Sequence, residues 1–209
     1  MQSIEQFEML VLRTALLVQF SASAWEQRKL GELYVRSGSG GTPKAGNPAY
    51  YGGSIPFLGI SDMNGRFITH TEKSITEKGL ANSAAWIVPA GSVSLAMYAS
   101  VGKVGITCCD IATSQAFFNM VFDSSITRDF VYARLDKADC EDEWRGLVST
   151  GTQSNLNAKK VRMWQLAVPS LPEQQAIGAF FRDFDDLIAL HQRKRICRTV
   201  FSVRLESWR

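Results

Sequence analysis

Histidine is scarce in this sequence, with His70 and His191 the only two among 209 residues. Neither has a cysteine or a carboxylate nearby at the spacing that a metal site or a nucleophile triad requires. We therefore expect no metal centre, and no hydrolase of the serine or cysteine type.

Cysteine is nearly as rare, and its placement excludes the usual structural uses. The four cysteines are Cys108, Cys109, Cys140 and Cys197. An adjacent pair cannot form an ordinary disulfide, and the spacing of the others is not that of a zinc knuckle. We expect free thiols in a reducing cytoplasm.

A long apolar run is also missing. Residues 9–20 form the most apolar stretch, but it is too short to span a bilayer and Arg13 interrupts it. Glu5 and Glu8 stand where a signal peptide would be basic. We expect no membrane association, and we interpret residues 3–19 as a helix that packs on the domain or on a partner.

Motifs for nucleotide or cofactor binding are incomplete. No Gly-Lys-Ser/Thr of the P-loop type occurs, and Thr42-Pro43 after the glycines at 38–41 blocks a dinucleotide-type helix start. Residues 47–50, Asn-Pro-Ala-Tyr, differ at Ala49 from the Asn-Pro-Pro-Tyr motif of amino-methyltransferases. We predict no catalytic residues and no cofactor.

What the chain does contain is a globular composition, with 45% hydrophobic and 21% charged residues and a net charge of +3. That charge permits nucleic-acid binding without requiring it. The length fits one domain with an extension. Strands and helices do not alternate regularly, so the fold class predicted is α+β, with a mixed or antiparallel sheet. The expected strands are 92–98, 104–107, 117–122 and 166–168, the short helices 126–135 and 141–148, and the long irregular loop 31–54.

The C-terminal part predicts a long helix. Ser170-Leu171-Pro172-Glu173 reads as a capping box after a strand that ends at Pro169. From Leu171 to about residue 196 the helix would be on the order of 38 Å long. Its apolar stripe would form a seam for another helix, and its candidate partner-binding residues are Ile177, Phe181, Phe184, Leu187 and Ile188. Its polar flank, with Asp183, Asp185 and Asp186, reads as a solvated face.

Several short segments resemble, in order and spacing, the specificity subunits of type I restriction-modification systems. These segments are Ala24–Leu33, Ile55–Leu58 with Asp62, Ile87–Val93, Tyr98, Gly102–Gly105, Ala112–Phe117 (where Ser114 replaces the usual Asn) and the strand-to-helix junction at 151–184. The resemblance implies a target-recognition domain at 23–169 and a conserved spacer helix at 170–209. The N-terminal helix, assigned to 1–22, lies upstream of the resemblance. The family plan has two recognition domains and two spacer helices, whereas this chain has length for one of each.

By this resemblance the chain would bind double-stranded DNA and recruit a modification subunit, which methylates adenine, and a restriction subunit. Two copies, or this chain and another specificity fragment, would pair through antiparallel helices. Cationic side chains neutralise phosphates, and amide and hydroxyl groups bond base edges. The candidate DNA-binding residues are Lys103, Thr113, Ser114, Gln115, Gln153, Ser154, Asn155, Lys159 and Lys160. Weaker candidates for backbone contacts are Arg36, Lys44, Arg66, Lys73 and Lys78.

Two other functions stay open on the sequence. One is a small DNA methyltransferase or nuclease with an unrecognised site. The other is an interaction module that pairs through its helix without contacting DNA.

Overall fold

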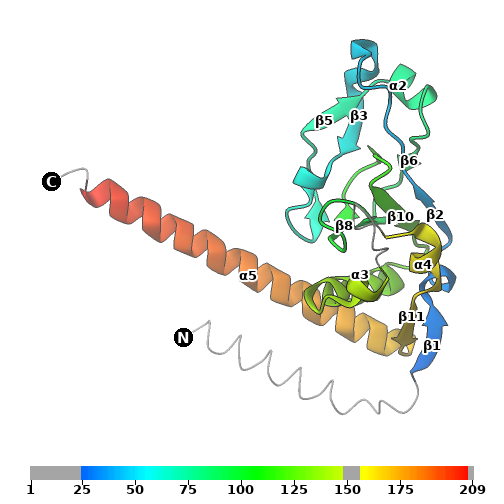
Figure 1. Cartoon of the computed structure of the whole chain (residues 1–209). Coiled ribbons are helices and arrows are strands. Elements are labelled where there is room, and N and C mark those ends of the chain that lie inside the picture. Colours follow the sequence, from blue (N-terminus) through cyan, green and yellow to red (C-terminus); the bar gives the residue numbers. More distant parts are fainter. Residues whose placement is uncertain (1–24, 148–155, 207–209) are drawn as a thin grey trace.

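The computed structural model describes residues 25–147 and 156–206, and for residues 188, 189 and 191–206 it describes the helical backbone only. A globular part is followed by one long helix that projects from it (Figure 1). The helix predicted at 3–19 lies outside the described residues, as do the candidate DNA contacts Gln153, Ser154 and Asn155.

Three sheets build the globular part. The largest has the order β2 (Arg36–Ser39), β10 (Phe117–Val121), β7 (Val93–Ala96), β8 (Val104–Thr107) and β4 (Phe67–Ile68). The second has the order β5 (Lys73–Ile75), β3 (Tyr51–Leu58), β9 (Ile111–Thr113) and β6 (Ile87–Val88). In the third, β1 (Glu26–Lys29) pairs with β11 (Gln165–Val168). Most pairs are antiparallel, but β3 with β9 and β4 with β8 are parallel, which confirms the predicted α+β class.

The helices are short except for two. They are α2 (Glu77–Ala81), α3 (Ser125–Cys140), α4 (Ala158–Met163) and α5 (Leu171–Glu206), with 3-10 turns at Leu30–Glu32, Pro48–Tyr50, Ile60–Asp62 and Glu143–Gly146. Helix α3 runs five residues past the end predicted for it, and the helix predicted at 141–148 is only a 3-10 turn. The reason is Asp142, whose left-handed φ of 55° ends the helical path.

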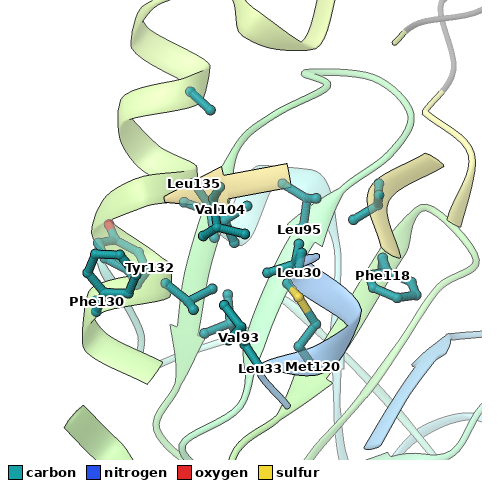
Figure 2. Close-up of a cluster of buried hydrophobic side chains, with 14 of the residues drawn as sticks. Leu30, Leu33, Val93, Leu95, Val104, Phe118, Met120, Phe130, Tyr132 and Leu135 are labelled. Atoms are coloured by element: carbon teal, nitrogen blue, oxygen red, sulfur yellow. The ribbon is translucent and has the colours of Figure 1, made fainter. Parts of the chain in front are cut away.

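The five-stranded sheet is buried on both faces. Helix α3 covers one face over a cluster that includes Leu95, Phe118 and Leu135 (Figure 2). The other face carries a second cluster, with Ala96 and Phe117. All four residues of β7 are buried, so the prediction of one buried face for this strand was wrong, because the second sheet covers its other side.

The predicted irregular loop 31–54 is wrong in part, since it contains β2 and the start of β3. Strand β2 is Arg-Ser-Gly-Ser, a sequence with little strand propensity. Its strand conformation is imposed by neighbouring segments. Residues 39 to 36 pair with residues 118 to 121 of β10, and a Cβ on Gly38 would lie 3.3 Å from the indole nitrogen of Trp86.

Helix α5 begins as predicted but is longer. It has 36 residues, about 54 Å at 1.5 Å per residue. At its start the Ser170 amide donates to the Glu173 carboxylate at 3.0 Å, and the Ser170 hydroxyl donates to the same oxygen at 2.7 Å. The reciprocal half of the expected capping box, a hydroxyl that accepts from the Glu173 amide, is replaced by this second bond. Among the described residues, no helix is both long and apolar enough to cross a membrane.

Helices α3 and α5 pack closely and are joined by an ionic cluster. A Cβ on Gly178 would lie 2.9 Å from the Cβ of Asp129, so only glycine permits this approach. The side chain of Arg66 is 3% exposed. Its guanidinium nitrogens lie 3.6 Å from a carboxylate oxygen of Asp129 and 3.3 Å from a carboxylate oxygen of Asp185. Arg182 also contacts Asp129, at 3.2 Å. Two expectations are thereby corrected, because Arg66 is not free for a DNA phosphate and Asp185 is not simply a solvated charge.

Candidate nucleic-acid interface

Met97 brings three of the predicted DNA-facing segments together through its main chain. Its amide donates to the Ala116 carbonyl at 2.7 Å, and its carbonyl accepts from the Leu156 amide at 3.0 Å. Three segments therefore meet at one place. They are the β7–β8 turn (residues 97–103), the β9–β10 turn (residues 114–116) and the residues directly before α4. The sequence separates these segments widely, and only the fold makes them one surface.

Thr113 does not belong to the exposed part of that surface. It is fully buried, and its hydroxyl accepts a 2.8 Å hydrogen bond from the Asn119 side chain. Asn119 is also fully buried; its amide donates to the Gly38 carbonyl, and its oxygen accepts from the Ser94 hydroxyl. Thr113 thus fixes the base of the β9–β10 turn, and as placed its side chain is not available to DNA.

The other two candidates here, Ser114 and Gln115, are half-buried and exposed, respectively. The Ser114 hydroxyl accepts from the Ala116 amide at 3.3 Å and so shapes the turn. Gln115 is exposed, and its carbonyl oxygen accepts from the Thr42 hydroxyl at 2.6 Å. This bond orients the carboxamide of Gln115, whose amide nitrogen is a donor suited to base edges.

A glycine-rich loop packs beneath the β9–β10 turn, where Gly40 and Gly41 are buried. The Gly41 amide donates to the Thr113 carbonyl at 2.9 Å, and a Cβ on Gly40 would clash with that same carbonyl oxygen. The contact needs bare backbone, which explains the glycines at this point. The sequence marks these glycines as turn formers but gives no sign that they pack against Thr113.

The three candidate lysines of the described chain are all exposed. Lys103 ends the β7–β8 turn, and its charge acts on Asp139; burial raises the pKa of that carboxyl, and Lys103 partly opposes the shift. Lys159 and Lys160 open α4, whose cap is Asn157, with its side chain accepting from the Lys159 amide at 2.8 Å. The Lys160 ammonium donates to the Leu147 carbonyl at 2.9 Å, so that lysine also has a structural tie.

The tip of the β7–β8 turn is strained. Ala99 and Ser100 have left-handed φ values of 38° and 63°. Such a pair of positions normally takes Gly, Asn or Asp, and each non-glycine residue there costs about 1 kcal/mol or more. The sequence offered no sign of this, because nothing in Tyr-Ala-Ser indicates a positive φ.

These features lie in a chain whose family can now be stated. A family model described as the type I restriction modification DNA specificity domain matches residues 22–196. The chain belongs to that family. The resemblance found in the sequence is therefore confirmed, and the turns above are parts of a specificity domain.

Named relatives of this specificity domain agree. The chain is 26% identical over 167 residues to the specificity subunit of the type I restriction enzyme MjaIX from Methanocaldococcus jannaschii, covering 78% of the chain and 38% of that relative. It is 29% identical over 148 residues to the HindI specificity subunit from Haemophilus influenzae, covering 70% and 32%. The chain thus spans less than half the length of these curated relatives.

Solved structures share the fold of this specificity domain. The HsdS subunit from Thermoanaerobacter tengcongensis matches with a TM-score of 0.57 at 17% identity, covering 92% of the chain and 47% of that subunit. A structure described by the assembly and conformational transition of the type I R-M system matches with a TM-score of 0.65 at 19% identity, covering 98% and 51%. At these identities the likeness is one of fold.

The apolar stripe of α5 divides into a packed part and an exposed part. Ile177 is half-buried and packs against the core cluster under α3, so part of its surface serves the domain itself. Phe181 and Phe184 are each 40% exposed, and Phe180 contacts both rings. Leu187 is half-buried, and the side chain of Ile188 lies outside the described part.

The rival explanation is an enzymatic site. Across residues 25–147 and 156–187, histidine, cysteine and carboxylate side chains do not gather in a group of three that could hold a metal ion. A cleft of about 230 Å³ beside β5 is lined by residues that include His70, Glu72 and Cys109. It is smaller than the 300–1,000 Å³ usual for ligand pockets, and too small for a nucleoside cofactor.

Proposed function

We propose that this chain is a DNA-recognition module of a type I restriction-modification specificity subunit and has no catalytic activity of its own. The family match over residues 22–196, which takes in both the globular part and most of α5, carries the proposal. It is supported by the surface around Met97, where exposed lysines and amides from separate segments adjoin.

The residues proposed to contact DNA fall into two groups. Lys103, Lys159 and Lys160 carry the charges that neutralise phosphates, which sets affinity and its dependence on salt. Gln115 and Ser114 present hydrogen-bonding groups suited to base edges. Gln153, Ser154 and Asn155 stay in the proposal on their sequence context alone.

The partners proposed are duplex DNA, a modification subunit and a restriction subunit. Curated relatives named as specificity subunits of restriction enzymes support this. We also propose that α5 pairs with a second helix, from another copy of this chain or from another specificity fragment. The exposed rings of Phe181 and Phe184 support such a seam.

The experiment that tests the proposal is retention of duplex DNA by the purified chain across a salt series. We expect binding whose logarithm falls linearly with the logarithm of salt concentration, and no methyl transfer from labelled S-adenosylmethionine without a partner subunit. Absence of retention at low salt would favour the interaction module, and methyl transfer by the chain alone would favour the enzyme.

A further inference from the structure

The tip of the β7–β8 turn is exposed at Tyr98, Ala99 and Ser100, between buried residues on the strands that lead to it. Tyr98 places an aromatic ring there, with 36% of the residue exposed. The residue is therefore partly covered by the protein and partly accessible to a ligand.

The base of this turn is clamped on both sides. On one side Met97 bonds to Ala116 and to Leu156 through its main chain. On the other side a Cβ on Gly102 would lie 2.6 Å from the Trp144 ring, so the turn packs tightly on the 3-10 turn after α3. Between Ala96 and Lys103 the strand ladder continues, with the Ala96 amide donating to the Lys103 carbonyl at 2.8 Å. The tip therefore projects from a rigid base.

The positive φ values of Ala99 and Ser100 set the direction in which the chain turns at the tip. Two successive left-handed residues turn the chain sharply after Tyr98, and strain of this kind persists only where the surroundings hold it. A tyrosine on a backbone held in this way loses little main-chain freedom when it binds, which favours contact with a ligand.

We propose that the Tyr98 ring contacts a nucleobase, and so determines part of the recognised sequence. This inference rests on the proposed function and deepens it. The ring is uncharged and flat, so it suits the methyl edge of a base in the major groove or the face of an unstacked base, whereas the phosphates are matched by Lys103 at the other end of the same turn. Gln115 of the adjoining β9–β10 turn supplies hydrogen bonds beside it.

The test is selection of bound sequences from a pool of duplex oligonucleotides with a randomised centre, using the full chain. The Tyr98→Ala variant should bind the sequence enriched by the parent about tenfold more weakly, with an unchanged salt slope. Its own selection should lose preference at one or two adjacent positions and keep the others. Tyr98→Phe should keep both affinity and preference.

Phe67→Ala serves as a matched control, because Phe67 is also an exposed aromatic residue, at 45%, but lies at β4 away from this turn. Should Tyr98→Ala not fold, Tyr98→Leu carries the test, since leucine keeps volume without a flat ring. An unchanged motif and affinity in the Tyr98 variants would overturn the inference, as would a Tyr98→Phe variant as weak as Tyr98→Ala, which would indicate a hydroxyl contact instead. If the parent chain enriches no sequence and retains no duplex, the proposed function itself fails.

Discussion

Arg66 and Asp185 lie 119 positions apart in the chain, yet their side chains are joined by a 3.3 Å contact between the guanidinium and the carboxylate. The Arg66 carbonyl accepts from the Ile106 amide in β8, and β8 leads directly out of the β7–β8 turn. One residue therefore links the long helix to the sheet that presents the proposed DNA-facing surface, so the direction of α5 and the position of that surface are set together.

Replacing Arg66 by Met should lower the free energy of unfolding by about 3 kcal/mol, because it leaves acidic groups without their buried partner. Arg182→Ala is the matched control, since its side chain is 45% exposed, and it should cost less than about 1 kcal/mol. Urea denaturation measures both. Equal effects would mean that burial of Arg66 does not matter to the junction.

Lys103→Ala and Lys159→Ala should each weaken duplex binding similarly for all sequences and reduce the salt slope by roughly one unit. Lys160→Ala should do the same with some loss of stability, because its bond to the Leu147 carbonyl is also removed. Lys137, which pairs with Glu141 at 2.8 Å on α3, is the control. A slope that changes with Lys137→Ala but not with the other three would locate the DNA surface elsewhere.

Changing both Phe181 and Phe184 to Asp should abolish pairing through α5, because charges in an apolar seam cost several kcal/mol, on the order of 3 or more. Sedimentation should move from dimer to monomer while circular dichroism of the globular part persists. Leu171→Asp is the control, since Leu171 is 58% exposed at the helix start. A parent chain that is monomeric at tens of micromolar would contradict self-pairing and favour a second, different fragment.

Ala99→Gly should stabilise the fold by about 0.5 kcal/mol, because glycine adopts a positive φ without strain, partly offset by its greater freedom when unfolded. Ala45→Gly, at an exposed loop position without a positive φ, should instead be slightly destabilising. Thermal unfolding of the two variants, compared with the parent, checks the sign. A loss of stability in Ala99→Gly would show that the turn is not strained.

Asp139→Asn should stabilise the protein at neutral pH. Burial raises the pKa of the Asp139 carboxyl, so the charged form is disfavoured in the fold. That penalty is fully present above the raised pKa and disappears as pH falls through it toward the ordinary value. The advantage of the variant should therefore shrink on acidification, which melting curves at pH 7 and pH 4 can follow. A stability advantage of the variant that grows at low pH would mean that the fold lowers the pKa of Asp139.

Local signals predicted several elements well. Strand β8, Val-Gly-Ile-Thr, has three β-branched residues among its four and follows the turn at Gly102. The Ser170 and Glu173 spacing marked the start of α5, because a cap depends on neighbours in sequence. Strand β2 could not be predicted, since its hydrogen-bonding partner in the sheet is β10 and Trp86 packs against its glycine.

The candidate site also contains residues that local sequence indicates and residues whose role depends on distant partners. Lys103 and Gln115 could be chosen from the sequence because turns expose polar residues. Thr113 looked equivalent to its neighbours, and only its bond to Asn119 reveals that it is structural. Arg66 also looked like a surface charge. Its partners Asp129 and Asp185 belong to α3 and α5 and lie far from it in the sequence.

The pairing of β1 with β11 has a consequence for how such a chain can change. Glu26 lies opposite Val168, so the backbone enters and leaves the globular part at neighbouring points, directly before α5. A segment whose two ends lie together can be replaced as a single unit, bringing different surface turns while the frame that holds the helix is kept. The same arrangement lets a second such unit be joined in tandem without rebuilding the first.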